Sequence, residues 1–230
     1  MQPIVKKLSG LVLSGMVICG TAFADGGISL QGTRIVYPQK EHQQTISVRN
    51  SSSTESFLIQ SWVEDAAGHK SRDFIVTPPL YVSAPGNENT MRVMLTNSAL
   101  PQDRETIYYF VSKAIPSIND DAKGHSVLKL SAANRIKLFV RPAGLKVDID
   151  KAPGMLTFHR AGNKLEINNP TPYYLTMTHI ESGGKTLSDI MVAPESKATE
   201  ILPAGSGNSV SYETIGDYGN KTARQTKSVN

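Results

Sequence analysis

Short runs in which apolar and polar residues alternate follow one another along most of the chain, and turn residues separate them. The runs are rich in β-branched and aromatic side chains, as is typical of half-buried strands. They predict strands at residues 28–37, 44–48, 57–64, 89–96 and 106–115, and later at 155–158, 164–167, 173–180 and 209–212. No segment sustains a helical apolar stripe of useful length. The spacing of the strands favours an all-β fold of the antiparallel sandwich type.

One run, residues 126–140, is far longer than the others. The residues on one of its parities are apolar apart from Asn134: Leu128, Leu130, Ala132, Ile136, Leu138 and Val140. The run predicts a strand of about 14 residues, whereas strands usually have five or six. On the pattern alone two interpretations stay open. The apolar face packs into its own core, which is the commoner case, or it is offered to a partner.

The long run ends in a sequence that breaks strands. Arg141 is followed by Pro142, Ala143 and Gly144. Proline cannot donate to a strand ladder, and glycine loosens the backbone. We therefore expect a domain boundary near Gly144, with a first sandwich in residues 25–144 and a second, smaller one in residues 145–230.

The first 24 residues have the pattern of an export signal. Lys6 and Lys7 form a positive region, residues 8–20 carry no charge, and the small Ala22 and Ala24 suit a signal peptidase. The apolar stretch is shorter than the about 20 residues that span a bilayer. We expect cleavage after Ala24, which leaves 230 − 24 = 206 residues and no membrane insertion.

The predicted mature chain carries little net charge and no recognisable catalytic motif. Loss of the two lysines lowers the formal net charge from +4 to +2, which does not suggest a nucleic-acid partner. The only cysteine, Cys19, lies in the predicted leader, so no disulfide and no nucleophilic cysteine is expected. The motifs of serine hydrolases, zinc proteases and phosphate-binding loops are absent, and the five histidines lack metal-ligand spacing. The sequence therefore predicts a non-enzymatic protein without a metal or a cofactor.

Seven short motifs resemble, in their order, those of the periplasmic pilus-assembly chaperones of Gram-negative bacteria. They are Thr33-Arg34, Trp62-Val63-Glu64, residues 74–79 (FIVTPP), 101–105 (PQDRE), 135–142 (RIKLFVRP), 169–174 (NPTPYY) and Asp217-Tyr218-Gly219. The resemblance covers about residues 28–219 and implies a periplasmic protein of two immunoglobulin-like sandwiches in a boomerang arrangement. It also implies the function. Such chaperones bind, fold and cap fimbrial subunits by lending them a strand, which is β-augmentation, and deliver them to an outer-membrane usher.

The resemblance assigns roles to residues of the long run and to two cations. Leu128, Leu130 and Ala132 are implied to enter the open groove of the subunit, and many relatives have a larger residue where Ala132 stands. Arg34 and Lys137 are implied to hold the C-terminal carboxylate of the subunit. Arginine binds a carboxylate bidentately and lysine adds a point charge. This anchor would fix the register of the added strand, since a slip of one residue turns the leucines away.

Three further charged residues and one connection match the same family. Glu105, Arg141 and Asp217 correspond to a charged set at the junction of the two domains, which implies an interdomain salt-bridge network. Residues 117–125 form a brief connection before the long run. A short loop here implies the short-loop branch of the family, which serves rod-forming fimbriae with adhesive tips.

Two other classes of function stay open. The first is an exported carbohydrate-binding or adhesive protein, which usually presents a strip of aromatic residues. The only tryptophan, Trp62, lies in a strand pattern that predicts a core position instead. The second is a periplasmic hydrolase whose catalytic residues meet only in space. A self-capping dimer also stays open, because an exposed long strand invites edge pairing.

Overall fold

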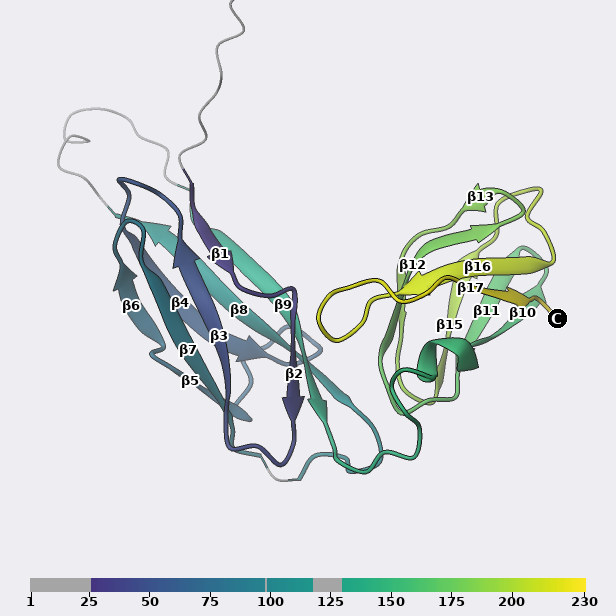
Figure 1. Cartoon of the computed structure of the whole chain (residues 1–230), viewed down its shortest axis with the longest axis horizontal. Helices are drawn as coiled ribbons and strands as arrows, with labels where there is room; N and C mark the ends of the chain where they lie inside the picture. The colour runs from purple at the N-terminus through teal and green to yellow at the C-terminus, as the bar shows by residue number, and fades with distance from the viewer. Residues whose placement is uncertain (1–25, 98, 118–129) are drawn as a thin grey trace, which may run out of the picture.

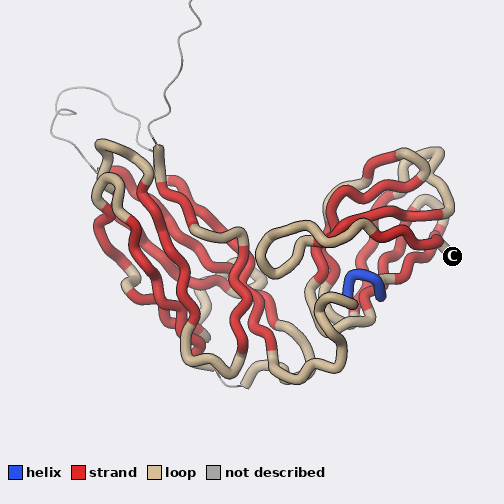
Figure 2. The backbone as a smooth tube through the Cα atoms, viewed as in Figure 1, coloured by secondary structure: helices blue, strands red, loops and turns tan. Residues whose placement is uncertain are grey.

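The computed structural model describes residues 26–97, 99–117 and 130–230 of the 230-residue chain. Its strands form two β-sandwiches, one from each half of the sequence (Figure 1). The sandwiches are the arms of a V, and the chain passes from one to the other at the closed end of the V (Figure 2). This confirms the predicted all-β fold of two sandwiches in a boomerang arrangement. The predicted leader lies outside the described residues.

The first sandwich consists of two sheets packed face to face. Its strands are β1 (Ile28–Leu30), β2 (Arg34–Pro38), β3 (Gln44–Asn50), β4 (Phe57–Glu64), β5 (Phe74–Thr77), β6 (Leu80–Ser83), β7 (Glu88–Leu95), β8 (Thr106–Pro116) and β9 (Ala132–Arg141). One sheet has the order β1-β3-β7-β5, and the other has the order β2-β9-β8-β4-β6. The strand order places β2 at one edge of the second sheet and β9 directly beside it.

The strand predicted at residues 28–37 is in fact two strands that belong to different sheets. β1 pairs antiparallel with β3, whereas β2 pairs parallel with β9. The switch occurs at Gly32, whose φ of +153° is a backbone conformation that residues with a side chain rarely adopt. One short segment of chain therefore supplies an edge strand to both sheets.

Alternation along the strands places one set of side chains between the two sheets. Tyr37, Ile59, Phe110 and Leu138 are fully buried there. Burial of side chains of this size contributes about 1.5–3 kcal/mol each. Leu138 and Val140 both belong to this core, which confirms the predicted apolar parity in the second half of the long run.

The long run forms a shorter strand than the sequence predicts. β9 begins at Ala132 and ends at Arg141, where the strand was expected to stop. Leu130 and the residue after it precede the strand, so the prediction of a continuous strand is wrong at these two positions. Leu128 lies outside the described residues.

The second sandwich has its own strands and its own core. Its elements are a short 3-10 helix η2 (Ala152–Met155), β10 (Thr157–Ala161), β11 (Lys164–Asn169), β12 (Leu175–Ser182), β13 (Lys185–Thr186), β14 (Ile190–Val192), β15 (Ser196–Ile201), β16 (Ser209–Thr214) and β17 (Gln225–Ser228). One sheet has the order β10-β11-β15. The other has the order β13-β12-β16-β17, with β14 also paired to β12. The strand predicted at residues 155–158 is wrong at its start, because Met155 ends η2 and β10 begins at Thr157.

The segment directly after β9 already belongs to the second arm. Leu145, Val147 and Ile149 pack against the core of the second sandwich. Tyr212 is fully buried in that core and donates its hydroxyl proton to the carbonyl oxygen of Pro153 at 2.7 Å. This hydrogen bond fixes η2 against the sandwich that follows it.

The first sandwich has a fully buried asparagine, Asn50, at the end of β3. Its side-chain nitrogen lies 2.8–3.2 Å from the carbonyl oxygens of Glu55, Ser83 and Ala84. Its side-chain oxygen accepts the backbone N–H of Ser52 at 3.0 Å. The side chain therefore ties the loop after β3 to the end of β6, and it satisfies backbone groups that would be costly to bury without partners.

The second sandwich repeats this arrangement with Asn169, which ends β11 and is also fully buried. Its side-chain nitrogen lies 2.8–3.2 Å from the carbonyl oxygens of Tyr173, Val192 and Ala193. Its side-chain oxygen accepts protons from both the backbone and the hydroxyl of Thr171. We refer to these two clusters as the Asn50 corner and the Asn169 corner.

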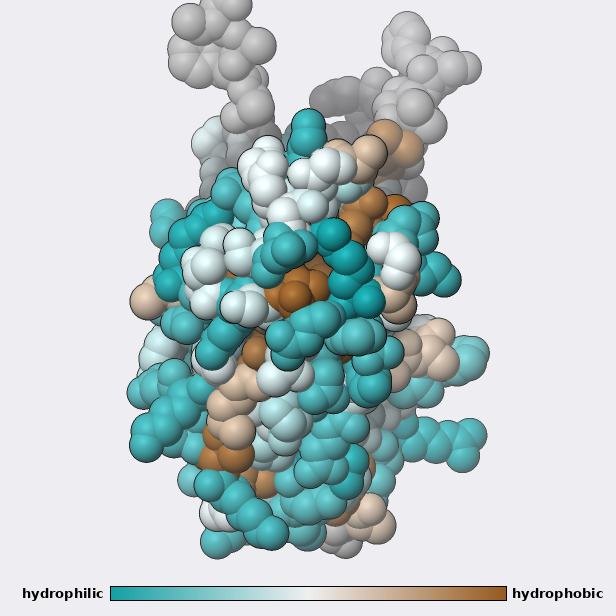
Figure 3. Space-filling model, turned by 90° about the vertical axis from the view of Figure 1, so that its right-hand side faces the viewer, coloured by the Kyte–Doolittle hydropathy of each residue, from teal (hydrophilic) through white to brown (hydrophobic). Residues whose placement is uncertain are grey.

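The end face of the second arm is largely hydrophilic, with only small separate hydrophobic patches (Figure 3). Within the described ranges, no helix is long and apolar enough to cross a membrane.

Candidate functional site

Arg34 and Lys137 lie side by side on the face of the first sandwich that looks toward the second arm. They are register partners in the parallel pair of β2 and β9, so their side chains point to the same side of the sheet. Arg34 Nη1 donates to the carbonyl oxygen of Ile215 at 3.0 Å, and Lys137 Nζ donates to Thr176 Oγ1 at 3.0 Å. The structure therefore brings the two predicted cations together at the cleft between the domains.

Neither of these cations has a carboxylate partner among the described residues. Burial lowers the pKa of the Arg34 guanidinium, and the charges of Asp217 and Glu105 offset this only in part. Burial also lowers the pKa of Lys137, and the positive charge of Arg34 lowers it further. The buried Nε of Arg34 has no hydrogen-bond partner. Two partly desolvated cations of this kind favour an anion, which would relieve their repulsion and complete their hydrogen bonds.

β9 has an open edge directly beside the two cations. β2 covers β9 only from Lys137 to Arg141, while β8 covers the other side of β9 from Ala132 to Val140. Residues 132–136 therefore have no strand partner on the β2 side within the described chain. Leu130, just before this edge, exposes 73 % of its surface. An unpaired strand edge next to an exposed leucine is a template for another strand.

The structure describes two of the three residues that were predicted to bind the groove of the subunit. Leu130 and Ala132 are exposed at the open end of β9 and stay outside the core of the first sandwich. Leu128 lies outside the described residues, so its predicted role stays a prediction.

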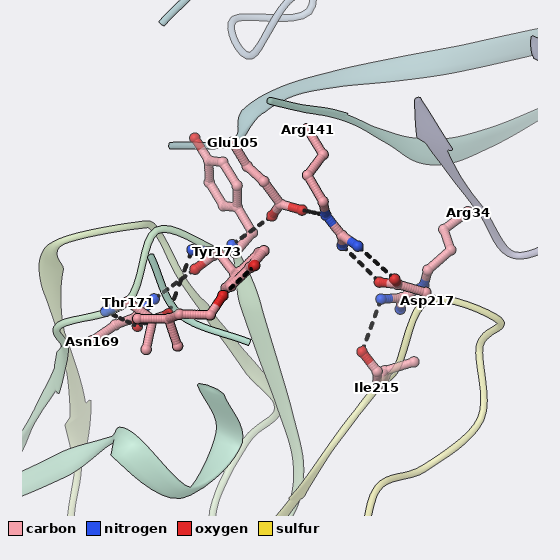
Figure 4. A network of polar contacts seen from close by, with 10 residues as sticks. Arg34, Glu105, Arg141, Asn169, Thr171, Tyr173, Ile215 and Asp217 are labelled. Atoms are coloured by element: carbon pink, nitrogen blue, oxygen red, sulfur yellow. Dashed lines mark hydrogen bonds and ion pairs between the residues drawn. The ribbon is translucent and has the colours of Figure 1, made fainter. Parts of the chain in front are cut away.

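A network of ion pairs holds the two arms together, with Arg141 at its centre (Figure 4). Arg141 Nε donates to Glu105 Oε1 at 2.7 Å within the first arm. Its two terminal nitrogens donate to both carboxylate oxygens of Asp217, in the second arm, at 2.6 and 2.7 Å. The second oxygen of Glu105 accepts the backbone N–H of Tyr174 at 2.8 Å. The structure thus brings together the three residues that the resemblance placed at the domain junction.

Burial shifts the pKa values of Glu105 and Arg141, two members of this network. Glu105 is only 3 % exposed, and burial raises the pKa of its carboxyl although the Arg141 guanidinium opposes this. Burial by itself lowers the pKa of Arg141, but the hydrogen bonds to Asp217 and the charge of Glu105 raise it above its usual value. Removing one member of a buried pair leaves an uncompensated charge, which typically costs about 3–5 kcal/mol. The network therefore fixes the angle of the arms only as long as all its members are present.

Two junction contacts were not predicted from the sequence. Arg104 Nη2 lies 2.9 Å from Glu195 Oε2, which gives a second ion pair between the arms. This pair is exposed, so it contributes little to stability. The backbone N–H of Glu105 also donates to the carbonyl oxygen of Pro172 at 2.9 Å. Glu105 and Pro172 belong to the motifs at residues 101–105 and 169–174, but nothing in the sequence indicated that these two motifs touch.

Trp62 does not lie in the core, so the prediction of a core position is wrong. It is half-buried on the outer face of β4, and its indole N–H donates to Glu64 Oε1 at 3.0 Å. The other oxygen of Glu64 accepts a proton from Arg135 Nε at 2.9 Å. The guanidinium of Arg135 covers the ring of Tyr109 at 3.4 Å from its centroid. Tyr109 therefore offers no open ring on this side for stacking against a sugar.

A cavity of about 430 Å³ opens between the arms next to Arg34. The first domain contributes Arg34, Phe139 and Arg141 to its lining, and the second contributes Tyr174 and Tyr218 among others. The rings of Phe139 and Tyr174 lie 5.8 Å apart across the junction. The site therefore combines a cation, apolar walls and an adjacent open strand edge. Together these features define a two-domain β-sandwich protein suited to bind an extended polypeptide by its end and along its backbone.

Comparisons with known proteins agree with this class. The family model described as pili and flagellar-assembly chaperone, PapD N-terminal domain, matches residues 27–146. The model described as pili assembly chaperone PapD, C-terminal domain, matches residues 151–226. The chain therefore belongs to the PapD family of pilus-assembly chaperones, which are non-enzymatic proteins.

Individual relatives match along most of their length. The chain is 39 % identical over 225 residues to the probable fimbrial chaperone SfmC of Escherichia coli (strain K12), covering 97 % of this chain and 98 % of that one. The crystal structure of the periplasmic chaperone SfaE has 39 % identity and a TM-score of 0.78, over 89 % of this chain and all of the other. The SafB chaperone, solved in complex with the SafA pilin of Salmonella enterica, has 29 % identity and a TM-score of 0.81, over 88 % and 96 % of the two chains.

Proposed function

We propose that this protein is a periplasmic chaperone that binds a fimbrial subunit lacking its last strand, caps it, and delivers it to an outer-membrane usher. The observation that carries the proposal is the position of the two cations. Arg34 and Lys137 form one rung of the β2–β9 pair, immediately beside the place where the edge of β9 becomes free. A chain that anchored its terminal carboxylate there would continue along the open edge.

The spacing of the site fits such a bound strand. Lys137 and Leu130 are seven positions apart in the chain, which corresponds to about 23 Å of extended chain at 3.3 Å per residue. Over this length the subunit would form ladder hydrogen bonds with β9, while Leu130 and Ala132 enter its open groove together with Leu128. The anchored carboxylate sets the register, because a shift of one residue would turn these side chains to the opposite face.

The remaining assignments complete the proposal. We infer that residues 1–24 are removed on export, that the mature protein begins at Asp25, and that the two domains divide at Gly144. The brief connection expected at residues 117–125 supports the short-loop branch of the family. The compartment and the partner are supported by two relatives, since SfaE is a periplasmic chaperone and SafB was solved in complex with a pilin. A self-capping dimer through the open edge of β9 is part of the same proposal.

Removal of the cations tests the carboxylate anchor. Arg34→Ala and Lys137→Ala should each give a folded protein that no longer co-purifies with its fimbrial subunit from the periplasm. The reason is that charge-assisted hydrogen bonds to a carboxylate are about twice as strong as neutral ones. The matched control is Arg49→Ala, which removes an exposed arginine from β3. Circular dichroism checks the fold of all three proteins, and mass spectrometry identifies and quantifies the subunit. Normal recovery of the subunit with both cleft variants would disprove the anchor.

A further inference from the structure

Tyr218 exposes 96 % of its surface, more than any other large apolar or aromatic side chain of the described residues. It lies in the loop between β16 and β17, and this loop reaches across the V toward β2 of the first arm (Figure 1). An aromatic ring in water contributes nothing to the core of the protein. A large exposed ring at a cleft is a common feature of a binding surface.

The loop that carries Tyr218 is held in place on both sides of the ring. Asp217 forms the bidentate pair with Arg141, at 2.6 and 2.7 Å. Gly219 packs so closely against the Thr33 hydroxyl of the first arm that a side chain at this position would collide with it. The backbone N–H of Gly216 also donates to the carbonyl oxygen of Asn220 at 2.7 Å, which closes the turn. Tyr218 is therefore presented by a preorganised loop, so little conformational entropy remains to be lost when a ligand covers it.

Two hollows flank Arg34, and Tyr218 lines both of them. The first is the cavity of about 430 Å³ between the arms, with apolar walls that include Phe139 and Leu175. The second has about 350 Å³ and lies between the loop and the β2 and β3 side of the first arm. Arg34 is a partly desolvated cation without a carboxylate partner among the described residues. The positive charge of Arg34 therefore favours binding of a carboxylate, and the apolar walls favour apolar groups attached to that carboxylate.

We propose that Tyr218 and the adjoining cavity form a binding site for the side chains that immediately precede the C-terminal carboxylate of a bound subunit, and that this site prefers apolar or aromatic residues there. The inference rests on the proposed function and extends it from the carboxylate to its neighbouring residues. Tyrosine suits this role, because it offers a large rigid contact area at a low cost in side-chain entropy. The carboxylate provides the anchor, and Tyr218 provides the discrimination between subunits.

Synthetic peptides can separate the two contributions. The probes are labelled peptides of about 15 residues, long enough to span the open edge at 3.3 Å per residue. One peptide ends in Phe-Tyr and the other in Ser-Gly, and each is made with a free carboxylate and as the C-terminal amide. Fluorescence anisotropy measures their affinities for the unchanged protein and for Tyr218→Ala, Tyr218→Phe and Ile201→Ala. Ile201 is the matched control, since it is 66 % exposed on β15 of the same domain and lines neither hollow.

The expected result is specific to one peptide. Tyr218→Ala should weaken the free acid ending in Phe-Tyr about fivefold to tenfold, as for a typical interface aromatic, and should change the Ser-Gly acid less than twofold. Tyr218→Phe should keep the preference, because it keeps the ring, and Ile201→Ala should change neither peptide. Thermal unfolding checks that all variants are folded.

Two kinds of failure are distinguishable. If the free acids bind more tightly than the amides but Tyr218→Ala weakens both acids equally or neither, the anchor stands and the role of Tyr218 is disproved. If acids and amides bind alike, or no peptide binds, both the proposed carboxylate anchor and this extension of it are contradicted.

Discussion

The two sandwiches close in the same way but differ in the chemistry beside the part of the last strand that stays uncovered. In the second arm the chain after β17 pairs parallel with β10, where Val229 lies opposite Phe158. This cover extends to the final residue, since Asn230 exchanges backbone hydrogen bonds with Phe158 and Arg160. In the first arm β2 pairs parallel with β9 but leaves residues 132–136 without a strand partner on that side within the described part of the chain. Among the described residues, β17 itself pairs only with β16 and is a polar edge strand, whereas the open end of β9 follows the exposed Leu130 and lies beside two cations.

The two asparagine corners differ in which parts of the protein they hold. In the second arm, the peptide group between Tyr173 and Tyr174 is held from both sides. Its carbonyl oxygen accepts from Asn169, and its N–H donates to Glu105 of the first arm. The Asn50 corner holds loops of the first arm alone. The same local structure therefore serves only stability in one domain, and stability together with domain orientation in the other.

The largest expected effect comes from removing these corners one at a time. Asn50→Ala and Asn169→Ala should each lower the free energy of unfolding by about 3 kcal/mol, because several buried backbone groups lose their partners. Urea denaturation measures the loss. Only Asn169→Ala should accelerate hydrogen exchange at the Tyr174 amide, since that amide faces Glu105. Equal exchange at Tyr174 in both variants would show that the Asn169 corner does not control the junction.

A smaller effect is expected at the open end of β9. Leu130→Ser should weaken subunit binding about tenfold or more, because burial of a leucine contributes about 1.5–3 kcal/mol. The same change should leave the unfolding free energy almost unchanged, since Leu130 is 73 % exposed in the free protein. The control is Val82→Ser on β6 at the opposite edge of the same sheet, where the side chain is 67 % exposed. Surface plasmon resonance with an isolated subunit compares the variants, and equal affinities would remove Leu130 from the groove.

The smallest effect concerns the protonation of Lys137. Burial and the charge of Arg34 lower the pKa of Lys137 below its usual 10.5. Below the lowered pKa the ammonium is charged and ready to bind a carboxylate. As the pH rises through that value the free protein loses this charge, so the affinity for the subunit should fall, by more than twofold at pH 10.5, where more than half of Lys137 is neutral. Lys137→Arg is the control, because arginine stays charged and should give a flat profile. A flat profile for the unchanged protein would contradict a charged Lys137 in the anchor.

Local alternation predicted most of the strands that build each core, but it missed β5, which contributes Phe74 and Val76 to the first one. β4 was predicted with its observed bounds, and the parity of Leu138 and Val140 was correct. β15 and β17 were not predicted, because their sequences are polar and their stability comes from pairing with β11 and β16. The change of sheet between β1 and β2 was also missed, because it depends on pairing with β3 and with the distant β9.

The residues of the site likewise differ in whether the local sequence could predict them. Arg34, Lys137 and the junction network came from the resemblance, because charges on separate strands carry no local signal of their meeting. Trp62 was misplaced since the large tryptophan was expected inside, whereas the parity of β4 puts the small Ser61 there. In the sequence, Asn50 before a serine and Asn169 before a proline indicate only turns. Their buried roles depend on carbonyl groups of distant loops.

A self-capping dimer through the open edge of β9, as proposed above, would make the empty protein its own competitor. A second copy that paired with residues 132–136 would occupy the place of the subunit, and mass action would favour it as the concentration rises. The apparent dissociation constant for a subunit would then increase with the total concentration of the chaperone. The affinity measured with a concentrated preparation would then be lower than the affinity measured with a dilute preparation, although no contact with the subunit had changed.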